Sequence, residues 1–275
     1  MPEAPDLEVI REVLSQRVKG LTVEHARVLR PLELRVLASA DFPQDIQSRS
    51  FTAFRRRGKF LLMELSGERL LVVNPMLTGV LQLCSPSERV AKRTSFVLAL
   101  SDGRELRYLD ETQMGMAYYL DSSQLAQVPR LVEQGPDVLD QYPSLPDFKD
   151  RLRRFQGEIK GILTRGRFIS GIGNAYADEV LFAAGIFPFK KRKALTDDDL
   201  CRLHETIQDV LHRAISILRE RMGDDIHLKV RDFLQVHGKG GSPCPRCGGN
   251  ITAIGANQRL TNYCRHCQPG MLVRN

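Results

Sequence analysis

Two pairs of cysteines near the end of the chain are the residues best placed to do chemistry. Cys244 and Cys247 form one Cys-x-x-Cys pair, Cys264 and Cys267 form a second, and 16 residues separate the pairs. Each pair presents two thiolates from a tight turn, and a hairpin brings all four to one tetrahedral zinc ion. Four protein ligands leave no open position for a catalytic water, so we expect one structural Zn²⁺. Disulfides are the alternative, which an intracellular chain disfavours.

A glycine-rich turn before a helical pattern is a second candidate site, here for an anion. Residues 171–174 read Gly-Ile-Gly-Asn. Such a turn exposes backbone N–H groups, and the start of a helix adds partial positive charge. We expect Asn174 at the N-cap, where its amide either caps its own helix or reaches a phosphate, with Lys160 adding a point charge from the preceding helix. Arg259, on the cysteine hairpin, suits a forked contact with phosphate.

The net charge of +7 is unevenly divided along the 275 residues. Residues 1–146 carry 18 Lys and Arg against 19 Asp and Glu, a net −1, whereas residues 147–275 carry 22 against 14, a net +8. A basic half favours a polyanionic partner, because cations that neutralise phosphates release condensed counterions. A solvated basic face is the alternative. With no apolar run long enough for a membrane span and no secretory pattern, we expect a cytoplasmic, nucleoid-associated protein and no membrane partner.

The elements that must position these residues differ between the two halves. Apolar residues at helical spacing predict one amphipathic helix over residues 6–21. Short β-rich runs bounded by Gly, Pro, Asn or Asp follow, which predicts antiparallel strands packed as a sandwich. These runs are residues 60–65, 70–73, 95–100 and 105–109. After a proline-rich stretch the chain turns helical, and Thr196 with Asp199 three residues later predicts the start of a long helix.

Five motifs occur in order along nearly the whole chain, and together they carry a family resemblance. They are Pro2-Glu3-Ala4-Pro5-Asp6, Arg57-Gly58-Lys59-Phe60, Gly135-Pro136-Asp137, the segment from Ile159-Lys160 through Gly171-Ile-Gly-Asn174-Ala-Tyr-Ala-Asp-Glu179, and Arg259-Leu-Thr-Asn-Tyr-Cys-Arg-His-Cys-Gln268. The chain resembles the formamidopyrimidine-DNA glycosylase and endonuclease VIII family of base-excision repair enzymes.

The resemblance implies an α+β fold of two domains. An N-terminal antiparallel β-sandwich with a leading helix is expected over residues 1–128. The proline-rich stretch over residues 129–146 is the expected hinge. A helix-two-turn-helix domain is expected over residues 147–231, and a Cys₄ zinc finger hairpin over residues 232–275.

The resemblance also assigns the reaction to the N-terminus. Loss of Met1 would leave Pro2 as a secondary amine whose pKa, near 8, leaves a useful fraction unprotonated. Pro2 is then the nucleophile at C1′ of the sugar, and Glu3 is the general acid and base. Asp6 stands where the family usually has glutamate and reaches one methylene less far; a first-turn helix carboxylate is its alternative role. Lys59 acts near the leaving group, and Arg259 contacts the phosphate of the lesion and assists the second elimination.

A base inside a duplex must be flipped out, and apolar side chains fill the gap. The resemblance places Leu77, Gln113 and Met114 at these wedge positions, and Arg93 where many members have a DNA-contacting histidine. Residues 217–236 are several residues shorter than in members that fold a loop over 8-oxoguanine. We therefore expect 8-oxoguanine to be a poorer substrate than formamidopyrimidines, hydantoins or oxidised pyrimidines.

Damaged double-stranded DNA is the expected partner, with no small-molecule cofactor and a monomeric chain. A relative that binds damaged DNA without catalysis is the main alternative, and retention of Pro2, Glu3 and Lys59 argues against it. A metal-dependent nuclease is the second alternative, but the sequence has no carboxylate cluster suited to Mg²⁺.

Overall fold

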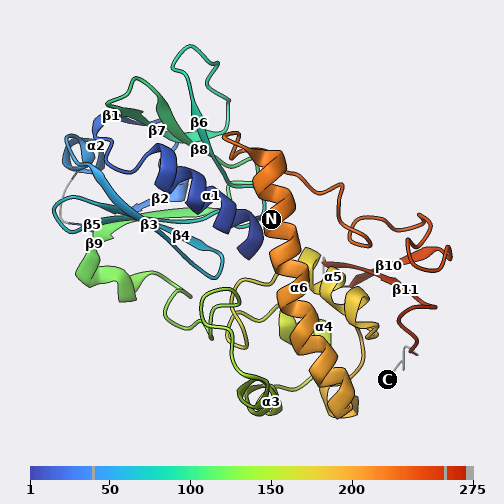
Figure 1. The fold of residues 1–275 in the computed structure, drawn as a ribbon. Helices are drawn as coiled ribbons and strands as arrows, with labels where there is room; N and C mark the ends of the chain where they lie inside the picture. The colour runs from blue at the N-terminus through green and yellow to red at the C-terminus, as the bar shows by residue number, and fades with distance from the viewer. Residues whose placement is uncertain (39–40, 257–258, 271–275) are drawn as a thin grey trace. The chain divides into compact units, whose positions relative to one another are not determined.

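The computed structural model describes residues 1–38, 41–256 and 259–270, with the backbone alone at Ala256 and Arg259. The chain divides into two compact units (Figure 1). The first contains Met1–Val132 and Ile215–Lys229, and the second contains Glu133–Ala214 and Val230–Asn275. The first is mainly β and the second mainly helical, so the expected α+β fold is confirmed.

Two sheets form the sandwich of the first unit. A four-stranded antiparallel sheet has the order β1-β7-β8-β6, and a five-stranded sheet has the order β2-β9-β5-β4-β3. The strands are β1 (Val23–Val28), β2 (Leu34–Val36), β3 (Phe51–Arg57), β4 (Phe60–Leu65), β5 (Arg69–Asn74), β6 (Val80–Cys84), β7 (Thr94–Leu100), β8 (Glu105–Leu109) and β9 (Met116–Asp121). Strands expected over residues 60–65, 70–73, 95–100 and 105–109 are thus found within one residue at each end.

The edge strand β2 departs from the expected antiparallel arrangement. It runs parallel to β9, with Leu34 opposite Ala117 and Val36 opposite Tyr119. The strand is three residues long and follows a short 3₁₀ helix, η1 (Pro31–Glu33). So short a segment has too little periodicity to predict a strand or its direction from sequence.

The leading helix, α1 (Ala4–Arg17), begins and ends earlier than the range 6–21 expected from the apolar pattern. Pro5 lies in its first turn, where proline is favoured because its missing N–H has no helical partner there. Glu8 of α1 accepts a hydrogen bond from the buried guanidinium of Arg56 on β3, at 2.8 Å from Nε. Burial raises the pKa of Glu8, but hydrogen bonds from Arg11 and Arg56 bring it below its usual value. This ion pair fixes α1 against the sheet.

Aromatic side chains fill the space between the two sheets. Phe42 belongs to α2 (Phe42–Ile46), and its ring lies 5.9 Å from Phe96 of β7 and 5.0 Å from Tyr119 of β9. The ring of Phe96 also stacks on Tyr108 of β8 at 5.6 Å. All four rings are almost completely buried. The helix α2 therefore contacts both sheets and closes one side of the core.

The second unit is built from helices and one hairpin. Its elements are α3 (Leu145–Arg153), α4 (Ile159–Leu163), α5 (Asn174–Ala184), η3 (Arg192–Ala194), β10 (Ile251–Ala256) and β11 (Arg259–Cys264), together with the first part of α6 (Asp197–Met222). The predicted cap of α6 is confirmed: Asp199 N–H donates to the Thr196 hydroxyl at 3.1 Å, and Thr196 N–H donates to Asp199 at 3.0 Å.

Candidate functional site

The N-terminus of the first unit holds three of the predicted catalytic residues. Pro2 is buried beside an apolar cavity that Leu7 and Tyr108 also line. Glu3 is the N-cap of α1, and its N–H donates to Asp6 at 2.8 Å. Glu3 and Asp6 are only 1% and 6% exposed. The first turn of α1 therefore holds two carboxyl groups next to Pro2 in a fixed arrangement.

Lys59 lies in the tight turn between β3 and β4. Gly58 precedes it with a φ of 58°, a left-handed conformation that favours glycine. Arg56 donates to the carbonyl of Gly58 at 3.2 Å and is paired with Glu8 of α1. The half-buried Lys59 is thus carried by a turn that one buried arginine ties to α1.

Two turns carry the predicted wedge residues. Leu77 and Met114 are 44% and 50% exposed, so both apolar side chains are accessible to another molecule. Met76 and Gln113 have φ values of 46° and 55° without being glycine. Such backbone costs about 1–3 kcal/mol per residue and persists only where the surrounding structure enforces it.

Arg93 and Gln113, predicted separately as DNA-binding residues, are hydrogen-bonded to each other. The guanidinium Nη1 of Arg93 donates to Oε1 of Gln113 at 2.8 Å. The backbone carbonyl of Arg93 also accepts from the N–H of Asp110, at 3.1 Å. One arginine therefore supports both the side chain of Gln113 and the turn that carries it.

Lys160 and Asn174 both donate to one carbonyl group of the hairpin. The carbonyl of Leu260 accepts from Lys160 Nζ at 3.1 Å and from Asn174 Nδ2 at 2.7 Å. Gly173, rather than Asn174, is the N-cap of α5, so Asn174 is its first residue. This shift by one position turns the Asn174 amide away from capping and towards the finger.

Lys160 is also 2.6 Å from Oδ1 of Asp178, in an ion pair whose side chains are 9% and 0% exposed. Sequence reasoning did not single out Asp178 or its neighbour Glu179. Asp178 also accepts from the N–H of Asn262 at 3.1 Å, and Glu179 accepts from three consecutive backbone N–H groups of residues 235–237. Two adjacent acids in an otherwise apolar helix were the available signal. They bind the hairpin and the preceding turn to α5.

The four cysteine thiols lie together at the base of the β10–β11 hairpin. Their sulfur atoms are all within 4.8 Å of one another, and this is the one such cluster of potential ligands in the described ranges. Cys244 and Cys267 are 3.8 Å apart, close to the spacing of about 3.8 Å that a tetrahedron of 2.3 Å Zn–S bonds requires. The N–H of Arg246 donates to Cys244 Sγ at 3.4 Å. The cysteines therefore fit one structural zinc ion, as predicted.

Arg259 begins β11, but its side chain lies outside the described part of the structure. Its predicted contact with phosphate stays a prediction. Within the described residues, no helix combines the length and apolar composition needed to cross a membrane.

Comparison with known proteins follows the same three parts. Residues 1–117 match the formamidopyrimidine-DNA glycosylase N-terminal domain, residues 134–224 match its H2TH domain, and residues 241–270 match a zinc finger found in FPG and IleRS. The formamidopyrimidine-DNA glycosylases of Symbiobacterium thermophilum and Heliobacterium modesticaldum are each 34% identical over 276 residues. These alignments cover 98% of this chain and 90% and 100% of those proteins.

Solved structures of Fpg and MutM bound to DNA are similar to this chain over nearly its whole length. The Lactococcus lactis Fpg in complex with an abasic site containing DNA superposes with a TM-score of 0.87 at 26% identity, covering 98% of this chain and 100% of that chain. MutM in complex with carbocyclic 8-oxo-G containing DNA has a TM-score of 0.86 at 26% identity, with the same coverage. The chain belongs to the formamidopyrimidine-DNA glycosylase family and is a DNA glycosylase of base-excision repair.

Proposed function

We propose that this glycosylase excises oxidised bases from damaged duplex DNA through a Schiff base on Pro2 and then nicks the strand. The observation that carries the proposal is the buried start of α1, where Pro2 adjoins Glu3 and the backbone N–H of Glu3 is held by Asp6. Removal of Met1 frees the Pro2 nitrogen. An α-amino group with a pKa near 8 needs no burial to be nucleophilic near neutral pH.

The proposed reaction starts with attack of the Pro2 nitrogen on C1′ of the damaged nucleotide. The C1′–N bond to the base breaks as the base accepts a proton, and opening of the sugar leaves an iminium between Pro2 and C1′. The iminium draws electrons from the sugar, so the 3′ and then the 5′ phosphate leave by successive eliminations. Glu3 exchanges protons with the sugar, and Lys59 acts near the leaving group.

Base flipping is assigned to the two exposed turns. Leu77, Gln113 and Met114 fill the space that the flipped base leaves, with Arg93 supporting Gln113. The turn at residues 171–174 with Asn174 holds a phosphate, and Arg259 contacts another. Lys160 is engaged by Asp178 and Leu260, so we propose that it acts on phosphate mainly by positioning the Asn174 turn.

The preferred substrates are formamidopyrimidines, hydantoins or oxidised pyrimidines rather than 8-oxoguanine. Residues 223–236, which follow α6, contain no helix or strand and leave little chain to cover a bound purine. Efficient removal of 8-oxoguanine opposite cytosine by the purified protein would refute this preference. Because its partner is damaged duplex DNA, we propose that the protein acts in the cytoplasm at the nucleoid.

The decisive experiment is borohydride trapping on duplexes that each carry one defined lesion or an abasic site. The variant is Pro2→Gly, and Pro5→Ala is the matched control because it changes a buried proline only three residues further along, in the first turn of α1. We expect a covalent complex with the wild type and the control, and strong loss with Pro2→Gly. Intact mass establishes whether Met1 has been removed.

Two outcomes would favour the alternatives. Tight binding without any trapped species, on lesions and abasic sites alike, would indicate a non-catalytic damage-binding relative. Strand cleavage that EDTA abolishes within minutes, with no trapped species, would indicate a metal-dependent nuclease.

A further inference from the structure

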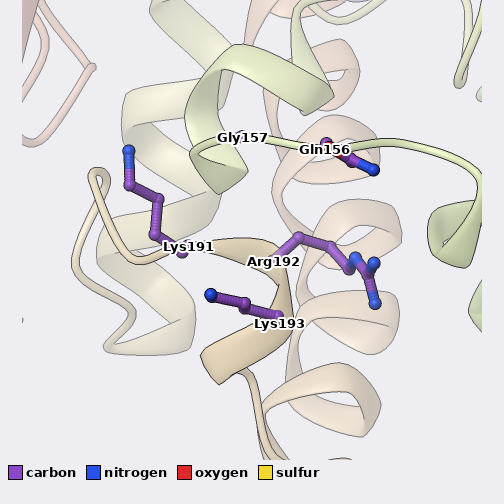
Figure 2. Close-up of a pocket in the computed structure, with 5 residues that line it drawn as sticks. All are labelled: Gln156, Gly157, Lys191, Arg192 and Lys193. Carbon is purple, nitrogen blue, oxygen red and sulfur yellow. The ribbon is translucent and has the colours of Figure 1, made fainter.

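Four consecutive cations, Lys190 to Lys193, lie between α5 and α6 in the second unit. Lys191, Arg192 and Lys193 line a cavity of about 380 Å³ together with Gln156 and Gly157. Figure 2 shows the two lysine side chains extending from one side of this segment and Arg192 from the other. This basic cavity, defined by those five residues, takes no part in the proposed reaction.

The basic cavity is held in shape by backbone hydrogen bonds. The N–H of Arg192 donates to the carbonyl of Gly157 at 2.9 Å, and the N–H of Ile159 donates to the carbonyl of Lys190 at 3.0 Å. Gly157 has a φ of 111°, which other residues adopt only with strain. The cations are therefore mounted on two segments fastened to each other and not on a loose loop.

Positive charge is in excess at the basic cavity. Lys190 is paired with Asp199 at 2.5 Å, and Lys191 lies 3.1 Å from Glu158 in an exposed pair. Arg192 donates from Nε to the uncharged carbonyl of Phe155 at 3.2 Å. Arg192 and the exposed Lys193 have no carboxylate partner in the described part of the chain. An exposed ion pair such as Lys191–Glu158 contributes little to stability. An anion with several acceptor atoms can therefore take the place of Glu158 beside Lys191 at low cost in free energy.

We propose that the basic cavity binds phosphates of the duplex flanking the segment held by the turn at residues 171–174. Phosphodiester oxygens supply the charge and the acceptors that the cations lack. Lys160 links the two places: its N–H donates to Pro188 at 3.1 Å, and its Nζ donates to the Leu260 carbonyl that Asn174 also contacts. The proposal rests on duplex DNA as the partner and extends the DNA contact along the second unit.

The test compares duplex lengths. The variant combines Lys191→Gln, Arg192→Gln and Lys193→Gln, and a control of equal charge change combines Lys19→Gln, Arg89→Gln and Lys229→Gln, all exposed. Fluorescence anisotropy gives the salt dependence of Kd for abasic duplexes of roughly 12 and roughly 30 base pairs. The logarithmic salt slope falls by about 0.9 for each phosphate that the protein no longer neutralises. We expect the slope of the cavity variant to fall by about 1–2 on the long duplex and to stay unchanged on the short one.

Three results would overturn the proposal. An unchanged slope on the long duplex shows that the cavity contacts no phosphate of DNA, and an equal decrease at both lengths, matched by the control, shows a general effect of net charge. Titration with inorganic pyrophosphate, followed by thermal shift, tests whether the ligand is a small phosphate compound instead of DNA. If pyrophosphate stabilises the wild type but not the cavity variant, and duplex length has no effect on the salt slope, the cavity binds a small phosphate and the proposal is overturned. Borohydride trapping on the short duplex reports on Pro2 separately, so failure of the Schiff-base mechanism and failure of this proposal are distinguishable.

Discussion

The hydroxyl of Thr78 donates a short hydrogen bond to the buried carboxylate of Asp110, and this bond joins the turns that carry Leu77 and Met114. Asp110 also accepts from the N–H of Gly115 at 2.6 Å and from that of Thr112 at 3.2 Å. A carboxylate that holds several donors at once restricts both turns together. The exposed side chains of Leu77 and Met114 are therefore presented as one platform.

Loss of the Thr78–Asp110 hydrogen bond is expected to weaken this platform. Thr78→Val removes the hydroxyl while keeping the β-branched shape. We expect loss of this hydrogen bond to cost about 1–1.5 kcal/mol and to slow base flipping roughly 10-fold. Stopped-flow fluorescence of 2-aminopurine next to the lesion measures the flipping rate. Thr78→Ser keeps the donor and is expected to behave like the wild type. If Thr78→Val flips bases at the wild-type rate, the hydrogen bond does not hold the wedge turns.

Zinc removal is expected to weaken DNA binding while leaving the β-sandwich folded. The finger contributes Leu260, whose carbonyl holds the Asn174 amide, so a loosened hairpin also loosens the turn at residues 171–174 that we propose to hold a phosphate. Cys247→Ser should lose the bound zinc and weaken Kd for DNA more than 10-fold, while Cys201→Ser, outside the cluster, changes neither. Metal content by mass spectrometry and anisotropy titrations check this. Zinc-free protein with normal affinity would contradict it.

The stability of the first unit should depend on the ionisation of Asp45. Burial raises the pKa of Asp45, but hydrogen bonds from Arg69, Tyr119 and Arg49 hold it well below its usual range. The donors lie 2.7, 2.6 and 2.7 Å from the carboxylate. Because the folded pKa is depressed, this stabilisation is complete above the unfolded pKa of about 3.9 and is lost as the pH falls through the folded value.

Asp45→Asn is therefore expected to lower stability at pH 7 by about 2 kcal/mol, and the difference from the wild type should shrink below about pH 4. Thermal melts between pH 2 and pH 7 measure it. The control, Asp41→Asn, changes an exposed aspartate just before α2 that makes no capping bond. A difference between wild type and Asp45→Asn that is constant with pH would contradict the assignment.

Replacing Glu33 is expected to stabilise the protein. Its side chain is fully buried, and neither carboxylate oxygen has a hydrogen-bond partner among the described residues. An unpaired buried polar group costs about 1–3 kcal/mol, so Glu33→Met should raise the melting temperature. Glu105→Gln, which breaks the buried pair with Arg107 at 2.6 Å, should lower it. A lower melting temperature for Glu33→Met would sink the prediction.

The sequence by itself determined the features that depend on nearby residues. Cys244 and Cys247 present their sulfurs from one turn because of their spacing, and the Thr196–Asp199 cap forms within one helical turn. Strands such as β4 follow from a short apolar run between turn residues. The order of motifs along the chain was enough to assign the family, because each motif is a short stretch of sequence that can be identified without the tertiary structure.

Tertiary structure alone decided which distant groups meet. Lys160 has the same local sequence whether its ammonium faces solvent or pairs with the buried Asp178, and only the packing of α4 on α5 selects the pair. The same holds for Thr78 with Asp110, which are 32 residues apart. It holds as well for residues 215–222, which continue a helix of the second unit yet belong to the first. Periodicity reports which face of an element is buried, whereas these contacts depend on which other element covers that face.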